Sequence, residues 1–91
     1  MNKPFCWNNE KNILLQAERG ISFEVVVTAI EENRLLDVIE HPNQEKYPSQ
    51  RIFIVEIDRY VYMVPFVESD EEIFLKTIIP SRKLKKKYLG D

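Results

Sequence analysis

The sequence predicts an α+β domain, with two N-terminal helices packed on a four-stranded antiparallel meander and a short basic helix at the C-terminus. The spacing of apolar residues is helical up to Asn33 and becomes strand-like after it. Only Asp58-Arg59 separates the two most apolar runs, which requires them to pair antiparallel. Pro80 and Ser81 then stop the last strand ahead of a lysine-rich segment.

Length and composition indicate one small soluble domain over residues 1–91. The chain has 91 residues, of which 44% are hydrophobic and 31% are charged. The N-terminus does not resemble a signal peptide and no apolar run is long enough to span a membrane, so we expect a cytoplasmic protein. A single cysteine, Cys6, and a single histidine leave no disulfide and no zinc-ligand cluster, so we expect neither a metal nor a cofactor.

The first predicted helix is delimited by its caps. Asn8 is a suitable N-cap, and Gly20 is placed as the glycine that ends a helix in the left-handed conformation. Ile13, Leu14 and Ala17 are predicted to form its inner face.

A second helix is predicted directly after the first. Ser22 is its N-cap, and apolar residues recur at helical spacing at Phe23, Val26, Val27 and Ile30. Three consecutive valines are poor helix formers, so a strand is the alternative for this segment. The two helices form a hairpin that must cover one face of the sheet, because neither layer is large enough to stand alone.

Three strands are predicted at residues 35–41, 51–57 and 60–68, with a loop at 42–50. The second and third strands are apolar on both faces, which predicts a central position with the helices on one face and another layer on the other. Pro65 would remove a ladder hydrogen bond, so a bulge or a sheet edge is predicted there.

The last strand and the basic helix follow. Residues 72–79 read as a strand, and a helix is predicted from Arg82. One face of this strand is predicted to hold Ile73, Leu75, Thr77 and Ile79. Five Lys or Arg residues against one aspartate give about +4 after residue 80, which leaves about −6 for the first eighty residues of a chain with net charge −2. Such a bipolar molecule can offer a local positive site to a phosphate.

The polar residues of the predicted sheet suggest an anion site. Arg51 begins a strand, Lys76 lies within one, His41 ends one, and Arg82 follows the last turn. We expect Arg51 and Arg82 to converge at alternate strand ends and to clamp a phosphate. Such a clamp can cleave RNA without a metal ion, because positioned cations stabilise the phosphorane while a general base takes the 2′-OH proton.

The remaining catalytic roles have several candidates. His41 or Glu45 is the candidate base, and Tyr88 or a lysine is a candidate to assist the leaving group. Each site residue also has a structural alternative. Arg51 can pair with a carboxylate such as Glu45, His41 can be an ordinary loop residue, and Lys76 can lay its stem along aromatic rings.

Four short motifs resemble one protein family. They are F-x-W-N-x-x-K-N at residues 5–12, R-G-I-S-F-E at 19–24, Q-R-I-F at 50–53 and I-I-P-S-R-K at 78–83. Together, over nearly the whole chain, they resemble the BrnT-type toxins of bacterial type II toxin-antitoxin systems. The resemblance implies a RelE-like ribonuclease fold, RNA cleavage that inhibits translation, and an antitoxin, often of the ribbon-helix-helix type.

The resemblance implies that the family's arginine at a strand start corresponds to Arg51 in this chain. The family's arginine after the last strand corresponds to Arg82. Where the family commonly ends its first helix in Lys-His-Gly, this chain has Glu18, Arg19 and Gly20, so the histidine of that motif is missing. Many of these toxins are also basic, whereas this chain is slightly acidic.

The sequence therefore predicts a metal-independent endoribonuclease toxin with Arg51, Arg82 and His41 as catalytic residues. The residues predicted to bind RNA are Arg19, Lys76, Lys83 and Lys86. The expected partners are RNA and a cognate antitoxin, in a homo-oligomer or a hetero-oligomer. The alternative is a non-catalytic module that docks a partner protein through the face of its sheet.

Overall fold

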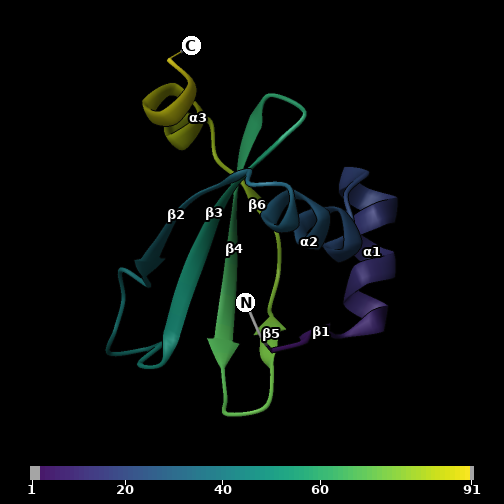
Figure 1. Ribbon diagram of the computed structural model, residues 1–91, viewed down its shortest axis with the longest axis vertical. Coiled ribbons are helices and arrows are strands. Elements are labelled where there is room, and N and C mark those ends of the chain that lie inside the picture. Colours follow the sequence, from purple (N-terminus) through teal and green to yellow (C-terminus); the bar gives the residue numbers. More distant parts are fainter. Residues whose placement is uncertain (1–2, 91) are drawn as a thin grey trace.

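The protein, seen in a computed structural model that describes residues 3–90, is a mixed sheet with two helices on one face and one helix on the other (Figure 1). The α+β class, the two N-terminal helices and the C-terminal helix are confirmed. The elements are β1 (Phe5–Trp7), α1 (Asn9–Arg19), α2 (Phe23–Glu31), β2 (Leu35–Glu40), β3 (Gln50–Ile57), β4 (Tyr60–Glu68), β5 (Ile73–Leu75), β6 (Ile79–Pro80) and α3 (Arg82–Leu89).

The sheet is larger than the predicted four-stranded meander. The strand order is β1-β5-β4-β3-β2, with β6 paired to β4. Strands β2 to β5 form the predicted antiparallel series, but β1 pairs with β5 in parallel, Phe5 facing Ile73. A strand of three residues is too short for its alternation to be recognised in a sequence.

The β3–β4 hairpin is the longest continuous pairing of the sheet. Its ladder runs without interruption from Gln50 opposite Val67 to Ile57 opposite Tyr60. Asp58 and Arg59 have φ values of 51° and 63°, and a positive φ at both central residues is typical of the type I′ turn that matches strand twist.

Pro65 lies within this hairpin, and on its β3 side there is neither the predicted bulge nor a sheet edge. It pairs with Ile52 in regular register, and its carbonyl accepts a hydrogen bond of 2.8 Å from the Lys76 N–H on the opposite side. The amide and carbonyl of a strand residue point to the same side. The N–H that proline lacks is therefore missing from the side of β5 and β6, and not from the β3 ladder.

The predicted last strand is divided into β5 and β6, and its alternation reverses between them. Leu75 faces Phe66 while Ile79 faces Met63, so four steps along this segment match three steps along β4. The extra residue turns each later side chain to the other face. Consequently Ile78 is buried in the cluster that holds Ile73 and Leu75, while Ile79 is exposed, so the predicted placement of Ile79 on the face of Ile73 and Leu75 is wrong.

Two apolar clusters lie on the two faces of the sheet, as its central strands predict. On one face Phe23 and Val26 of α2 pack with strand residues such as Phe53 and Val64. Because α2 is a helix, the strand alternative for this segment is wrong. On the other face the buried residues are Ile52, Ile54 and Val61, against which Leu84, Tyr88 and Leu89 of α3 pack.

The predicted inner face of α1 is wrong. Ile13, Leu14 and Ala17 are exposed, and the buried residues of the helix are Asn12 and Leu15. Asn12 accepts a hydrogen bond of 2.8 Å from the Phe23 N–H through its Oδ1 atom. Because this bond ties α1 to the first turn of α2, it fixes the rotation of α1 about its axis.

Candidate active site

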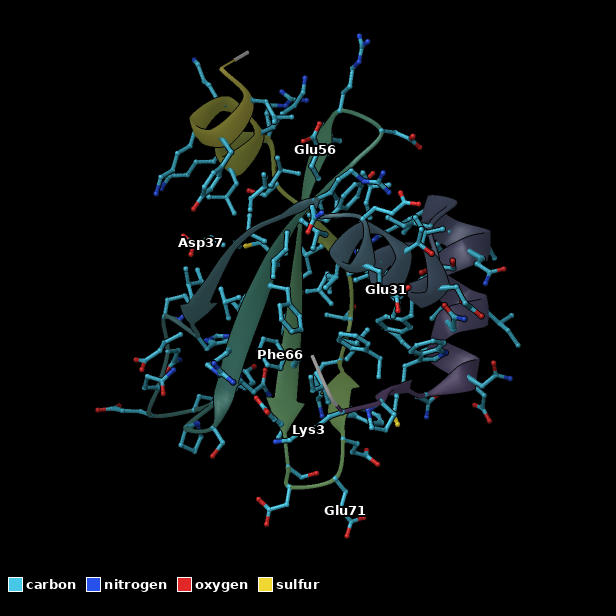
Figure 2. All side chains as sticks on the ribbon, in the orientation of Figure 1. Lys3, Glu31, Asp37, Glu56, Phe66 and Glu71 are labelled. Carbon is cyan, nitrogen blue, oxygen red and sulfur yellow. The ribbon has the colours of Figure 1, made fainter. Side chains whose placement is uncertain are left out.

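A pocket of about 430 Å³ opens on the face of the sheet that carries α1 and α2. Its lining residues come from four strands and the N-terminal segment, and they are Lys3, Val38, Arg51, Phe53, Phe66, Glu68 and Ile73. Figure 2 shows Lys3 and Phe66 toward the end of the sheet that is distant from α3. The volume falls within the range of about 300–1,000 Å³ that is usual for small-molecule sites.

The floor of the pocket is apolar and rigid. The Phe53 and Phe66 rings stack with their centroids 3.8 Å apart and their planes at 10°. Both side chains are buried in the apolar cluster on the face of the sheet that carries α1 and α2. The pocket therefore has a close-packed apolar floor beneath its charged rim.

The rim carries two cations and one carboxylate. Glu68 accepts from the Arg51 Nη2 atom at 2.6 Å through Oε1 and from the Lys3 Nζ atom at 2.7 Å through Oε2. Lys3 also donates to the Ser69 carbonyl at 2.8 Å. The Arg51 guanidinium lies 5.1 Å from the centre of the Phe66 ring, close enough for a cation–π contact.

This arrangement holds Glu68 in its charged form. The hydrogen bond from Lys3 is the main cause that lowers the pKa of Glu68 below its ordinary value, and the charges of Lys3 and Arg51 act in the same direction. Desolvation opposes them without reversing the shift. At neutral pH the rim therefore presents an ionised carboxylate between two cations.

Arg82 is not part of this pocket, and the predicted clamp with Arg51 does not form. Arg51 faces Phe66 on β4, whereas Pro80 faces Tyr62. Along β4, Arg51 and Pro80 are therefore four residues apart, which is about 13 Å. Arg82 lies still farther in the same direction. The prediction failed because β3 and the β5–β6 segment run in the same direction, which puts the start of one and the end of the other at opposite ends of the sheet (Figure 1).

His41 occupies a compact loop next to β2. Its N–H donates to the Gln50 carbonyl at 3.1 Å, and its ring lies 4.3 Å from that of Tyr47. The Nδ1 atom accepts from the Asn43 N–H at 3.0 Å, so this ring nitrogen is already occupied. His41 does not line the pocket, and these contacts are those of the loop residue named as its alternative.

The predicted RNA-binding residues come from α1, from the segment between β5 and β6, and from α3. Arg19 donates to the Ile78 carbonyl and is directed toward the strands. The Lys76 Nζ atom lies 5.5 Å from the centre of the Phe74 ring, which is a cation–π contact. Lys83 and Lys86 are exposed on α3.

Sequence reasoning missed Lys3 and Glu68. No pattern in the sequence distinguishes Lys3, which reaches the pocket only because β1 joins the sheet beside β5. Glu68, in contrast, could have been identified from the sequence. Once the two-residue turn fixes the register, Arg51 faces Phe66, and Glu68 becomes its diagonal neighbour of opposite charge.

Among residues 3–90 no three His, Cys, Asp or Glu side chains are grouped as metal ligands. The helices of this same stretch are each too short or too polar to cross a bilayer. Comparison of the chain with protein-family models, curated proteins and solved structures finds no match.

Proposed function

We propose that this protein is the toxin of a bacterial type II toxin-antitoxin pair, with a RelE-like fold, and that it cleaves RNA at the pocket around Arg51 and Glu68. The observation that carries the proposal is a carboxylate that accepts hydrogen bonds from two cations at the rim of a pocket of about 430 Å³. The sequence motifs support the toxin class. The proposed partners are an RNA substrate and a cognate antitoxin.

The proposed cleavage uses the 2′-OH of RNA as the nucleophile. Glu68 accepts the 2′-OH proton while the 2′ oxygen attacks phosphorus, and the P–O5′ bond breaks. Arg51 and Lys3 stabilise the negative charge of the phosphorane, and the Lys3 ammonium supplies the proton that the departing 5′ oxygen takes up. The products are a 2′,3′-cyclic phosphate and a 5′-OH end. Positioned cations suffice for this route, so the proposed activity is independent of metal ions.

In this proposal the basic helix α3 binds the RNA backbone away from the scissile bond. Arg82, Lys83 and Lys86 are exposed on α3. None of the carboxylates within residues 3–90 forms an ion pair with these three side chains. Arg82 therefore contributes to affinity and not to the reaction itself.

Expression of the chain alone tests this function. The wild-type protein is expected to arrest growth and to fragment cellular RNA. Glu68→Gln keeps the shape of the side chain and removes the base, so it should relieve the arrest. Glu32→Gln is the matched control, because Glu32 also forms an exposed ion pair with an arginine, Arg34, at 2.7 Å. A folded Glu68→Gln protein that remains fully toxic would remove the proposed base.

The second candidate is a non-catalytic module that binds a partner protein. It is favoured by the ion pair itself, because Arg51 and Glu68 neutralise each other without any ligand. It is also favoured by apolar residues that stay exposed, among them Val38 and Ile39 on β2. This candidate predicts that purified protein leaves RNA intact while still forming a complex, so the RNA assay separates the two functions.

A further inference from the structure

The outer face of α1 is apolar, although a helix of a small domain usually directs its apolar residues inward. Ile13 is 59% exposed and Leu14 is 47% exposed, the two highest values among the large hydrophobic residues between residues 3 and 90. Ala17 follows one turn later and is exposed as well. We call these three residues the α1 strip.

The α1 strip cannot turn inward by rotation of the helix. The inner face of α1 is occupied by Leu15, which is 2% exposed, and by Asn12, which is 3% exposed. Asn12 accepts from the Phe23 N–H and donates to the Glu24 Oε1 atom at 2.7 Å, which holds α1 against α2. Rotation would break both bonds and expose Leu15. The strip is therefore a stable feature of the folded surface.

The surroundings of the α1 strip are acidic. On the same helix Glu10 lies three residues before Ile13 and Glu18 lies four residues after Leu14, whereas Lys11 is the one cation at this spacing, three residues before Leu14. Within α1 and α2 there are four glutamates, Glu10, Glu18, Glu24 and Glu31, against Lys11 and Arg19. Arg19 is turned toward the Ile78 carbonyl, so it neutralises little of this outer surface.

We propose that the α1 strip is a docking surface for an amphipathic helix of a partner protein, with aliphatic residues along one face and Lys or Arg at its edges. A helix laid along α1 would cover Ile13 and Leu14, and its cations would meet Glu10 and Glu18. Charge complementarity selects this occupant over a second copy of the chain. Two parallel copies of α1 would set Glu10 against Glu10 and Glu18 against Glu18, and an antiparallel pair would have only Lys11 on each copy to offset the two glutamates.

The proposal does not depend on the pocket or on RNA cleavage. The direct test uses a synthetic helical peptide with leucines at i, i+3, i+4 and i+7 and lysines beside them, labelled with a fluorophore. The control peptide carries glutamates in place of the lysines. Fluorescence anisotropy with the full-length protein is expected to give at least about tenfold tighter binding of the lysine peptide.

Variants of the protein locate the binding surface. Ile13→Ser/Leu14→Ser is expected to weaken binding of the lysine peptide at least about tenfold. Ile79→Ser is the matched control, because Ile79 is 36% exposed on β6 and belongs to neither proposed binding surface. Glu10→Lys/Glu18→Lys should reverse the preference between the two peptides. Circular dichroism checks that each variant is folded, as expected for changes at exposed positions.

Three outcomes would overturn the proposal. One is binding of the lysine peptide that is equal in the wild type and in Ile13→Ser/Leu14→Ser. Another is the lack of any preference between the lysine and glutamate peptides. The third is a dimer in sedimentation that Ile13→Ser/Leu14→Ser abolishes, which would assign the α1 strip to a second copy of the chain.

Discussion

Arg51 and Glu68 are joined diagonally across the β3–β4 hairpin, with the Arg51 Nη2 atom 2.6 Å from Glu68 Oε1. Both side chains lie on the face of the sheet that carries α1 and α2, at the rim of the pocket. Lys3 holds the other oxygen of the same carboxylate. The start of β3, the end of β4 and the N-terminal segment thus contribute to one charged group.

Arg51→Ala should lower the rate of RNA cleavage by about 100-fold, the usual loss when one donor to a developing negative charge is removed. The matched control is Arg34→Ala. Arg34 also pairs with a glutamate, Glu32, and its side chain is 40% exposed compared with 47% for Arg51. Cleavage of a labelled RNA by purified proteins measures the effect, and equal rates for the two variants would contradict the assignment.

Glu68 should make the stability of the protein sensitive to acid. Its pKa is lowered in the folded state from an ordinary value of 4.5, so its contribution is complete above that value and is lost as the pH falls through the folded-state pKa. Urea unfolding at a series of pH values should show that Glu68→Gln loses less free energy of unfolding below pH 4.5 than the wild type does.

Lys3→Ala provides the second arm of the acid experiment. The hydrogen bond from Lys3 is the main cause of the lowered pKa of Glu68, so this variant should bring that pKa back toward its ordinary value. The urea midpoint of Lys3→Ala should then change with pH more like that of Glu68→Gln than like that of the wild type. A wild-type acid response in both variants would show that other carboxylates determine it.

The helix α3 should account for much of the salt dependence of RNA binding. For single strands the slope of log affinity against log salt changes by about 0.7 for each phosphate contact that is lost. Lys83→Ala/Lys86→Ala should therefore reduce the slope by about 1.4. Lys11→Ala/Lys46→Ala removes the same charge away from α3 and should leave the slope near the wild-type value, as titrations at several salt concentrations will measure.

Asn12→Ala should destabilise the fold by about 1–3 kcal/mol, because it leaves the Phe23 N–H without its partner at a buried position. Asn9→Ala, at an exposed position of the same helix, should change stability by less than about 0.5 kcal/mol. Urea unfolding curves compare the two. Equal effects would mean that Asn12 does not fix the packing of α1 on α2.

Local features of the fold could be predicted because nearby residues determine them. The Asn8 Oδ1 atom accepts from the Lys11 N–H and the Ser81 Oγ atom from the Leu84 N–H, as N-caps of α1 and α3. Gly20 ends α1 with φ at 66°. A cap or a tight turn is set by a few consecutive residues, so it can be read directly from the sequence.

The candidate site was only partly predictable. Arg51 was identified at a strand start and does line the pocket, but its predicted partner, Arg82, lies at the other end of the sheet. Lys3 and Glu68, which contact the site, were missed. The pocket depends on which strand ends share an edge, and that is decided by the direction of each strand in the assembled sheet.

The sequence by itself determined the α+β class, the helix caps and the register of the β3–β4 hairpin, because each depends on contacts within a short stretch of chain. Only the tertiary structure decided which face of α1 is buried, where β1 pairs, and how the β5–β6 segment changes face. Each of these depends on contacts between residues far apart in the chain. The hydrogen bond from the Phe23 N–H to Asn12 is one such contact, because it joins two different helices. It turns Asn12 inward and leaves Ile13 and Leu14 on the surface.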